Sequence, residues 1–145
     1  MQGVMLVLPE RYDLEFLWKR ASALQGVTTS GIQLGEFSVG SPEGGLVQVR
    51  PEPDVLDEFD GSTLSSIRSM LGSGPLGVFP FEYRMKDLPF LSRVLVALLD
   101  SVPSCLCNDY GLVVTGESAV QAVSRHPEWD WRRADELPEG FPDRC

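Results

Sequence analysis

The chain has 145 residues, 43% hydrophobic and 23% charged, which suits one domain with a single core and argues against wholesale disorder. Its 21 acidic residues outnumber its 12 lysines and arginines, giving a formal net charge of -9. Because phosphate backbones repel an acidic chain, direct binding to nucleic acid is not expected, whereas a basic protein partner would be attracted and would associate quickly.

The first part of the chain predicts a buried strand followed by a helix. Residues 4–8 form a continuous apolar run that ends at Pro9, as is typical of a buried strand. Asp13 can cap the helix that follows, because its carboxylate can accept hydrogen bonds from the first free amides. Apolar residues at helical spacing over 14–24 give this helix one buried side, and Gly26 ends it.

Two segments then predict a hairpin with one solvated face. Residues 32–39 and 46–50 alternate between apolar and polar side chains, with a Pro- and Gly-containing turn at 41–45 between them. The alternation of the first segment changes parity partway along. A bulge near Gly35 would reconcile the two halves.

An acidic run follows at residues 52–60, with five carboxylates and no cation. An EF-hand calcium loop is not expected there, because its closing glutamate would fall on Ser65. The run has two interpretations: a solvated, flexible surface, or an electrostatic patch that meets a basic partner. In the second interpretation the candidate partner-binding residues are Asp54, Asp57, Glu58 and Asp60.

The central part of the chain predicts helix, strand and helix. A short helix has its inner face within 64–71, and an aromatic, alternating strand occupies 76–83. Pro80 cannot donate to a strand ladder, so this strand is expected at a sheet edge or with a bulge. The helix at 88–99 is the most apolar one and is expected at the centre of the core.

The last predicted elements are two short strands and a capped helix. Residues 105–107 and 111–115 flank an Asn-Asp-Tyr-Gly turn, in which three of the four residue types tolerate positive φ. Thr115 can cap the final helix, which ends at His126 before Pro127. With no internal repeat and no long linker, the chain predicts a single α+β domain over residues 1–145. Its hairpin-rich antiparallel sheet would pack with about four helices, followed by an irregular acidic and tryptophan-rich tail from about residue 127.

No catalytic residue, metal site or cofactor is expected. Of the three cysteines, Cys105 and Cys107 would share one face of a strand, as a redox or metal pair or as small buried side chains, and Cys145 would be exposed. Their odd number predicts a reducing compartment. The single histidine, His126, stands where a helix end favours a cation, and no nucleotide-binding glycine motif is present. The chain start lacks signal-peptide features and no apolar run is long enough to span a bilayer, so the cytoplasm is the expected location.

The tail residues Trp129, Asp130, Trp131 and Arg132 are the second set of candidate partner-binding residues. If the tail is extended, both indoles face one side and Asp130 faces the other. Tryptophan and arginine are frequent in interface hot spots. The alternative is that the tail folds back and one or both indoles cover the core.

The end of the chain resembles a known class of proteins. Asn-Asp-Tyr-Gly at 108–111, Thr-Gly-Glu at 115–117 and Pro-Glu-Trp-Asp-Trp at 127–131 are similar to the closing segments of small cytoplasmic immunity proteins of bacterial polymorphic-toxin systems. The resemblance covers the last quarter of the chain. It implies a non-enzymatic binding protein that neutralises a cognate, basic toxin. The sequence leaves two other functions open, a small carboxylate-dependent hydrolase and an adaptor subunit of a larger assembly.

Overall fold

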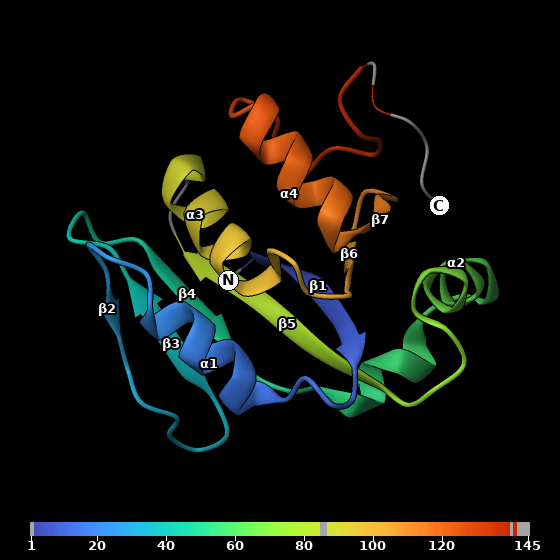
Figure 1. The fold of residues 1–145 in the computed structure, drawn as a ribbon, viewed down its shortest axis with the longest axis horizontal. Helices are drawn as coiled ribbons and strands as arrows, with labels where there is room; N and C mark the ends of the chain where they lie inside the picture. The colour runs from blue at the N-terminus through green and yellow to red at the C-terminus, as the bar shows by residue number, and fades with distance from the viewer. Residues whose placement is uncertain (1, 85–86, 140, 142–145) are drawn as a thin grey trace.

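The computed structural model describes residues 2–84, 87–139 and 141, which form a seven-stranded sheet with helices on both faces (Figure 1). The strands cross the sheet in the order β2-β3-β4-β5-β1-β6-β7, and all neighbours are antiparallel. Their bounds are Gln2–Pro9 (β1), Thr28–Thr29 (β2), Phe37–Gly40 (β3), Leu46–Val49 (β4), Leu76–Arg84 (β5), Cys105–Cys107 (β6) and Val113–Thr115 (β7). The chain therefore has the predicted α+β fold.

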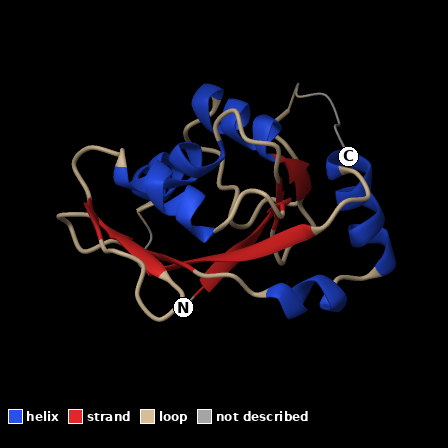
Figure 2. Ribbon diagram, turned by 60° about the horizontal axis from the view of Figure 1, so that its bottom comes forward, coloured by secondary structure: helices blue, strands red, loops and turns tan. Residues whose placement is uncertain are grey.

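Three helices lie over one face of the sheet and enclose the main core. They are α1 (Leu14–Ser22), α3 (Leu88–Leu99) and α4 (Gly116–Arg125), with α3 in contact with both of the others. Figure 2 shows most of the helices on this side of the sheet. The alternate inward residues of the strands, such as Leu6 and Phe81, pack against α3, which is buried along most of its length as its apolar sequence predicts.

The opposite face of the sheet is covered only in part. The 3-10 helix η1 (Pro53–Glu58) and helix α2 (Gly61–Leu71) pack there against β1, β5, β6 and β7. A second, smaller core joins Ile67 of α2 to Val7, Val78 and the two cysteines of β6. Cys105 and Cys107 are buried with 3.9 Å between their sulfur atoms, so they fill space as small side chains in this core, whereas Cys145 lies outside the described residues.

Each α-helix starts at a side chain that accepts a hydrogen bond from the backbone N–H three residues later. The four caps are Asp13, Asp60, Asp87 and Thr115, which bond to Phe16, Thr63, Phe90 and Ser118. Such caps satisfy amides that have no partner within the helix, so they fix where each helix begins. Asp60 thus has a structural task in addition to its place in the acidic run.

The predicted bulge near Gly35 is wrong. Strand β3 begins only at Phe37, and before it Gln33 and Glu36 bridge a tight turn in which Leu34 and Gly35 both have positive φ, at 54° and 78°. The parity change in the sequence therefore marks this turn. On its other side the chain runs along β3 as the edge strand β2, which the sequence did not predict.

The position expected for Pro80 is also wrong, because β5 lies inside the sheet between β4 and β1. The carbonyl of Val78 accepts a hydrogen bond from Glu52 on the β4 side, so the nitrogen of Pro80, two residues on, faces the same side. The β4–β5 ladder ends at the pair Val49 and Phe81, one residue before Pro80 would have to donate. The missing N–H thus ends the ladder and does not interrupt it.

No helix among the described residues is long and apolar enough to cross a membrane.

Candidate functional site

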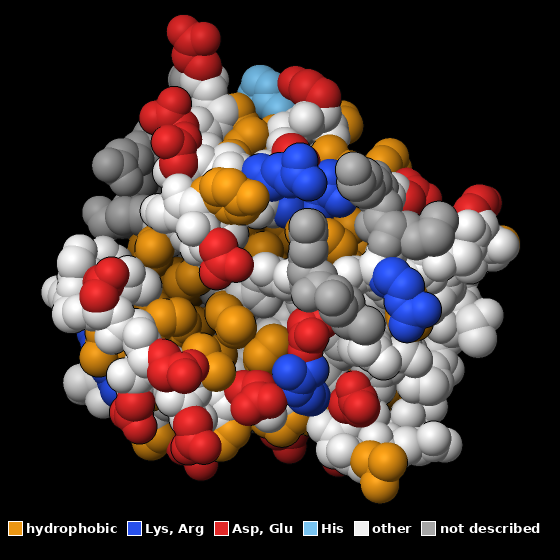
Figure 3. All heavy atoms as spheres, turned by 180° about the vertical axis from the view of Figure 1, so that it is seen from behind, with side chains coloured by type: hydrophobic (Ala, Val, Ile, Leu, Met, Phe, Trp, Pro, Cys, Tyr) orange, Lys and Arg blue, Asp and Glu red, His pale blue; other side chains and the backbone are white. Residues whose placement is uncertain are grey.

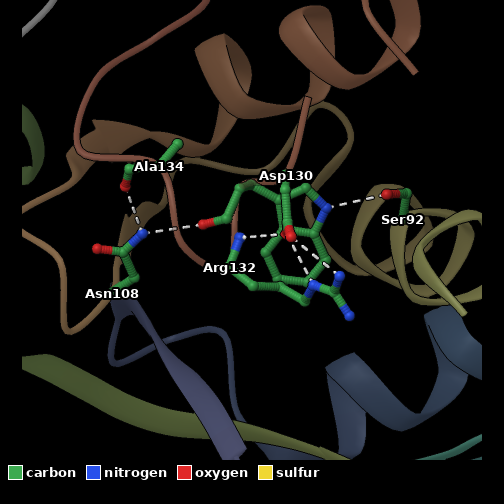
Figure 4. A network of polar contacts seen from close by, with 6 residues as sticks. Ser92, Asn108, Asp130, Arg132 and Ala134 are labelled. Atoms are coloured by element: carbon green, nitrogen blue, oxygen red, sulfur yellow. Dashed lines mark hydrogen bonds and ion pairs between the residues drawn. The ribbon is translucent and has the colours of Figure 1, made fainter. Parts of the chain in front are cut away.

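The tail and the turn before β7 meet in the structure, although 20 or more residues separate them (Figure 4). The Asn108 side chain donates from Nδ2 to the carbonyls of Trp131 (3.0 Å) and Ala134 (2.7 Å). Its Oδ1 accepts from the backbone amides of Tyr110 (2.8 Å) and Leu112 (3.0 Å). One side chain therefore shapes the turn and ties the tail to it.

Trp131 belongs to the core and is not available to a partner. Its side chain is fully buried, its indole nitrogen donates to the Ser92 hydroxyl at 2.9 Å, and its ring meets Phe81 edge-on at 5.6 Å. The sequence left open that one or both tail indoles cover the core, and this prediction is confirmed for Trp131. The tail is not extended, so its two indoles do not form one surface. It turns instead, because the amides of Trp129 and Arg133 donate to the carbonyls of His126 and Asp130.

Asp130 and Arg132 satisfy each other. The guanidinium donates to both carboxylate oxygens of Asp130, at 2.7 and 3.0 Å, and lies over the Tyr83 ring at 5.5 Å. Burial raises the pKa of Asp130, but the hydrogen bonds and charge of Arg132 outweigh it and hold the pKa below its usual range. Burial likewise raises the pKa of the Tyr83 hydroxyl, in spite of the nearby arginine charge. This bidentate pair holds the tail against the sheet.

Trp129 is the one tail tryptophan that reaches the surface. It is half-buried against the main core, and its indole nitrogen donates to the Glu136 carbonyl at 3.2 Å. Its aromatic edge can add to a contact surface, whereas the neighbouring Asp130 and Arg132 side chains are already bonded to each other.

The acidic run keeps its charge at the surface. Asp54, Asp57, Glu58 and Asp60 are exposed, and none of them forms an ion pair with a described residue. Only Glu52, at the start of the run, is neutralised, by Arg50 at 2.8 Å. Between the acids, Val55, Leu56 and Phe59 turn inward and pack against the second core, which is why the run forms η1 and not the flexible segment that was expected.

Two of these acids, Glu58 and Asp60, line a groove on the partly covered face of the sheet. The groove has a volume of about 320 Å³ and lies between η1, the start of α2 and the turn before β7. Its apolar lining includes Met5, Val55, Phe59, Cys107 and Val113. Its acidic lining consists of Glu58, Asp60 and Asp109. We call this the acidic groove. Figure 3 shows the same face, where acidic side chains gather beside a continuous area of hydrophobic atoms.

Asp109 and Tyr110 extend the candidate site beyond the residues that the sequence singled out. Tyr110 is 58% exposed, one of the few large hydrophobic side chains at the surface of the described residues. It stands in the turn whose next neighbours, Asn108, Asp109 and Gly111, line the acidic groove. The sequence did contain an indication of Tyr110 as a surface contact, since an aromatic residue inside a polar turn is not needed to fill the core.

The acidic groove offers carboxylate charge and apolar contact. The pKa of Asp60 lies below its usual range because the backbone and hydroxyl of Thr63 donate to its carboxylate. A lowered pKa with this cause marks a helix cap, whereas a catalytic acid would need the opposite shift. Among the described residues, no three metal-ligating side chains gather to form a candidate ion site.

Comparison with known proteins gave no match to a protein-family model, to a curated protein or to a solved structure.

Proposed function

We propose that this chain is a non-enzymatic binding protein that neutralises a basic toxin, as an immunity-type inhibitor does. The observation that carries the proposal is the acidic groove: exposed carboxylates that form no ion pair with a described residue, beside apolar surface, with Tyr110 at the same turn. Unpaired charge of one sign steers an oppositely charged partner, and apolar surface next to it supplies contact energy once the partner has docked.

Within this proposal the candidate residues have different tasks. Asp54, Asp57 and Glu58 are exposed and supply long-range attraction. Tyr110 and the exposed part of Phe59 supply the anchoring contact, since aromatic residues are frequent among hot spots. The tail contributes indirectly, because it holds in place the turn that carries Tyr110.

The first test is genetic and biochemical. We expect a basic protein to be encoded beside this chain, to be toxic when expressed alone, and to co-purify with this chain when both are expressed. Cells that express both should grow normally. A neighbouring gene product that is harmless and forms a constitutive complex would instead support the adaptor function, and absence of any such partner would remove the proposal.

The second test separates steering from anchoring. The triple variant Asp54→Lys, Asp57→Lys, Glu58→Lys should slow association with the basic partner at least tenfold at low salt, with little effect on dissociation. Tyr110→Ala should instead speed dissociation. The matched charge control is the triple Glu10→Lys, Glu43→Lys, Glu139→Lys, at exposed positions outside the acidic run, which should slow association much less. An unchanged association rate and salt dependence in the first triple variant would show that the acidic run is merely solvated.

A further inference from the structure

The helix layer on the other face of the sheet carries a second groove of opposite character. One branch, between α3 and α4, has a volume of about 440 Å³, and the other, between α1 and α3, about 500 Å³. Leu24 and Ala97 line both branches, so the two branches are adjacent. Its other apolar lining residues are Phe16, Ala23, Pro89, Val96, Val123 and Pro127. We call it the helix-layer groove.

The floor of this groove is the outward side of α3. The inward side of α3 already fills the main core with residues such as Leu91, Leu95 and Leu98. Because the helix is apolar around most of its circumference, Val96 and Ala97 are left half-buried on the outside, where they line the groove. Apolar surface that the chain's own core does not need is typical of a contact site.

The charges along the helix-layer groove are positive, in a chain whose formal net charge is -9. Arg93 donates to the Gln25 carbonyl at 2.7 Å, and Arg20 donates to the carbonyls of Ala97 (2.9 Å) and Asp100. These bonds hold both guanidinium groups in place without neutralising them, since neither arginine forms an ion pair with a carboxylate of the described residues. Lys19, beside Arg20, pairs only with the exposed Glu15.

We propose that the helix-layer groove docks an amphipathic helix of a partner protein, with carboxylates flanking its apolar side. An apolar helix face fits a groove between helices, and acidic flanks would meet Arg20 and Arg93, whose positions are already fixed. The net charge of the chain disfavours an acidic ligand in general, so its binding would depend on these fixed arginines. This inference goes beyond the proposed function, because the acidic groove on the other face would bind a partner of the opposite charge.

The test uses two synthetic amphipathic peptides of about 20 residues, above the length at which isolated helices are marginal in water. Both carry leucines at the same i, i+3, i+4 and i+7 positions, and they differ only in having glutamates or lysines on the flanks. Each is titrated into isotope-labelled protein, and backbone amide shifts are followed by NMR. We expect the glutamate peptide to shift amides of α1, α3 and the end of α4, and the lysine peptide to leave those amides unchanged.

Variants locate the contact. Arg93→Glu should weaken binding of the glutamate peptide about three- to tenfold, as expected for loss and reversal of an exposed charge contact. Val96→Gln should weaken binding of the same peptide without a change in salt dependence. Arg133→Glu is the matched control, because Arg133 is exposed and lines neither groove. Thermal denaturation of each variant establishes that it is folded.

Several results would overturn the inference. These are a saturating glutamate peptide that leaves the α3 amides unshifted, equal affinity of wild type and Arg93→Glu, or concentration-dependent self-association that occupies the groove with a second copy. If the lysine peptide also failed to shift amides around the acidic groove, that result would bear on the proposed function alone. The further inference and the proposed function can therefore fail separately.

Discussion

Asn108 makes four hydrogen bonds with one amide group, and this places much of the tail's stability on a single residue. The Asn108→Asp substitution preserves size and the two accepted bonds but replaces a donor of two hydrogen bonds by a carboxylate. The carbonyls of Trp131 and Ala134 would then face a negative charge. We expect a loss of about 2–4 kcal/mol in the free energy of unfolding, measured by urea denaturation at neutral pH.

The pH dependence of this variant identifies the cause. A carboxyl that faces two carbonyl oxygens is stabilised in its protonated form, so part of the lost stability should return as the pH falls. Asp109→Asn, at the exposed neighbouring position, is the control and should change stability by less than about 0.5 kcal/mol. If Asn108→Asp cost no more than this control, the Asn108 bonds to the tail would not contribute to stability.

The Asp130–Arg132 pair makes the tail sensitive to acid. Because the folded-state pKa of Asp130 is lowered, its contribution is complete above the unfolded-state pKa, near 3.8, and is lost as the pH falls through the folded-state value. Between pH 6 and pH 2, Asp130→Asn should therefore lose less stability than the wild type does. Asp60, also with a lowered pKa, titrates in the same direction and should keep the remaining slope above zero. Identical slopes in the variant and the wild type would contradict this assignment.

At the scale of an element, the turn before β3 holds Leu34 in a backbone conformation that lowers the stability of the fold. Leu34 is 103% exposed with φ of 54°, a conformation that costs an ordinary residue roughly 1–2 kcal/mol. It precedes Gly35, and Asn-Gly is the preferred pair for a two-residue hairpin turn with positive φ at both positions. Leu34→Asn should therefore raise the free energy of unfolding by about 0.5–1 kcal/mol.

The control for the turn is a substitution with the opposite effect. Leu34→Val should destabilise the protein, because a β-branched residue is least tolerant of positive φ. Both variants remove or shorten an exposed side chain that contacts nothing in the core, so any difference between them reports backbone strain. Equal stabilities of the two variants would show that the turn is not strained at this position.

The elements predicted correctly are those whose signal is local. Helix caps at Asp13 and Thr115, the helical spacing at 88–99 and the alternation at 46–50 each depend on residues close in sequence. Pro80 and the strand at Thr28–Thr29 depend on strand order, which local patterns do not encode. The two tail tryptophans are likewise equivalent in the sequence, and only the fold, through Asn108 and Ser92, assigns Trp131 to the core.

At the scale of the whole molecule, the two grooves, on opposite faces of the sheet, have apolar linings flanked by charges of opposite sign. The acidic part of the candidate site could be predicted from the sequence, because its residues lie in one contiguous acidic run. Its apolar lining was not visible, since Met5, Cys107 and Val113 come from three strands that only the antiparallel order brings together. The helix-layer groove is similarly built from α1, α3 and α4, so no single segment of the sequence predicts it.

The acidic run in η1, beside the acidic groove, should also cost the molecule stability in the absence of a partner. Asp54, Asp57 and Glu58 lie within one short helix, where like charges three and four residues apart repel each other, and the formal net charge of -9 adds to that repulsion. The triple variant Asp54→Asn, Asp57→Asn, Glu58→Gln should therefore raise the melting temperature by about 2–4 °C at low ionic strength. The increase should nearly vanish at 1 M salt, where charges are screened over about 3 Å.

A control triple at dispersed exposed acids, Glu10→Gln, Glu43→Gln and Glu139→Gln, changes the net charge equally without relieving a cluster. If it raised the melting temperature as much as the first triple, overall charge and not local crowding would explain the effect. If only the first triple did so, the folded protein tolerates a destabilising concentration of charge at this one surface. A binding function supplies a reason for that cost, since a partner's cations would neutralise on docking the charge that the free protein leaves unpaired.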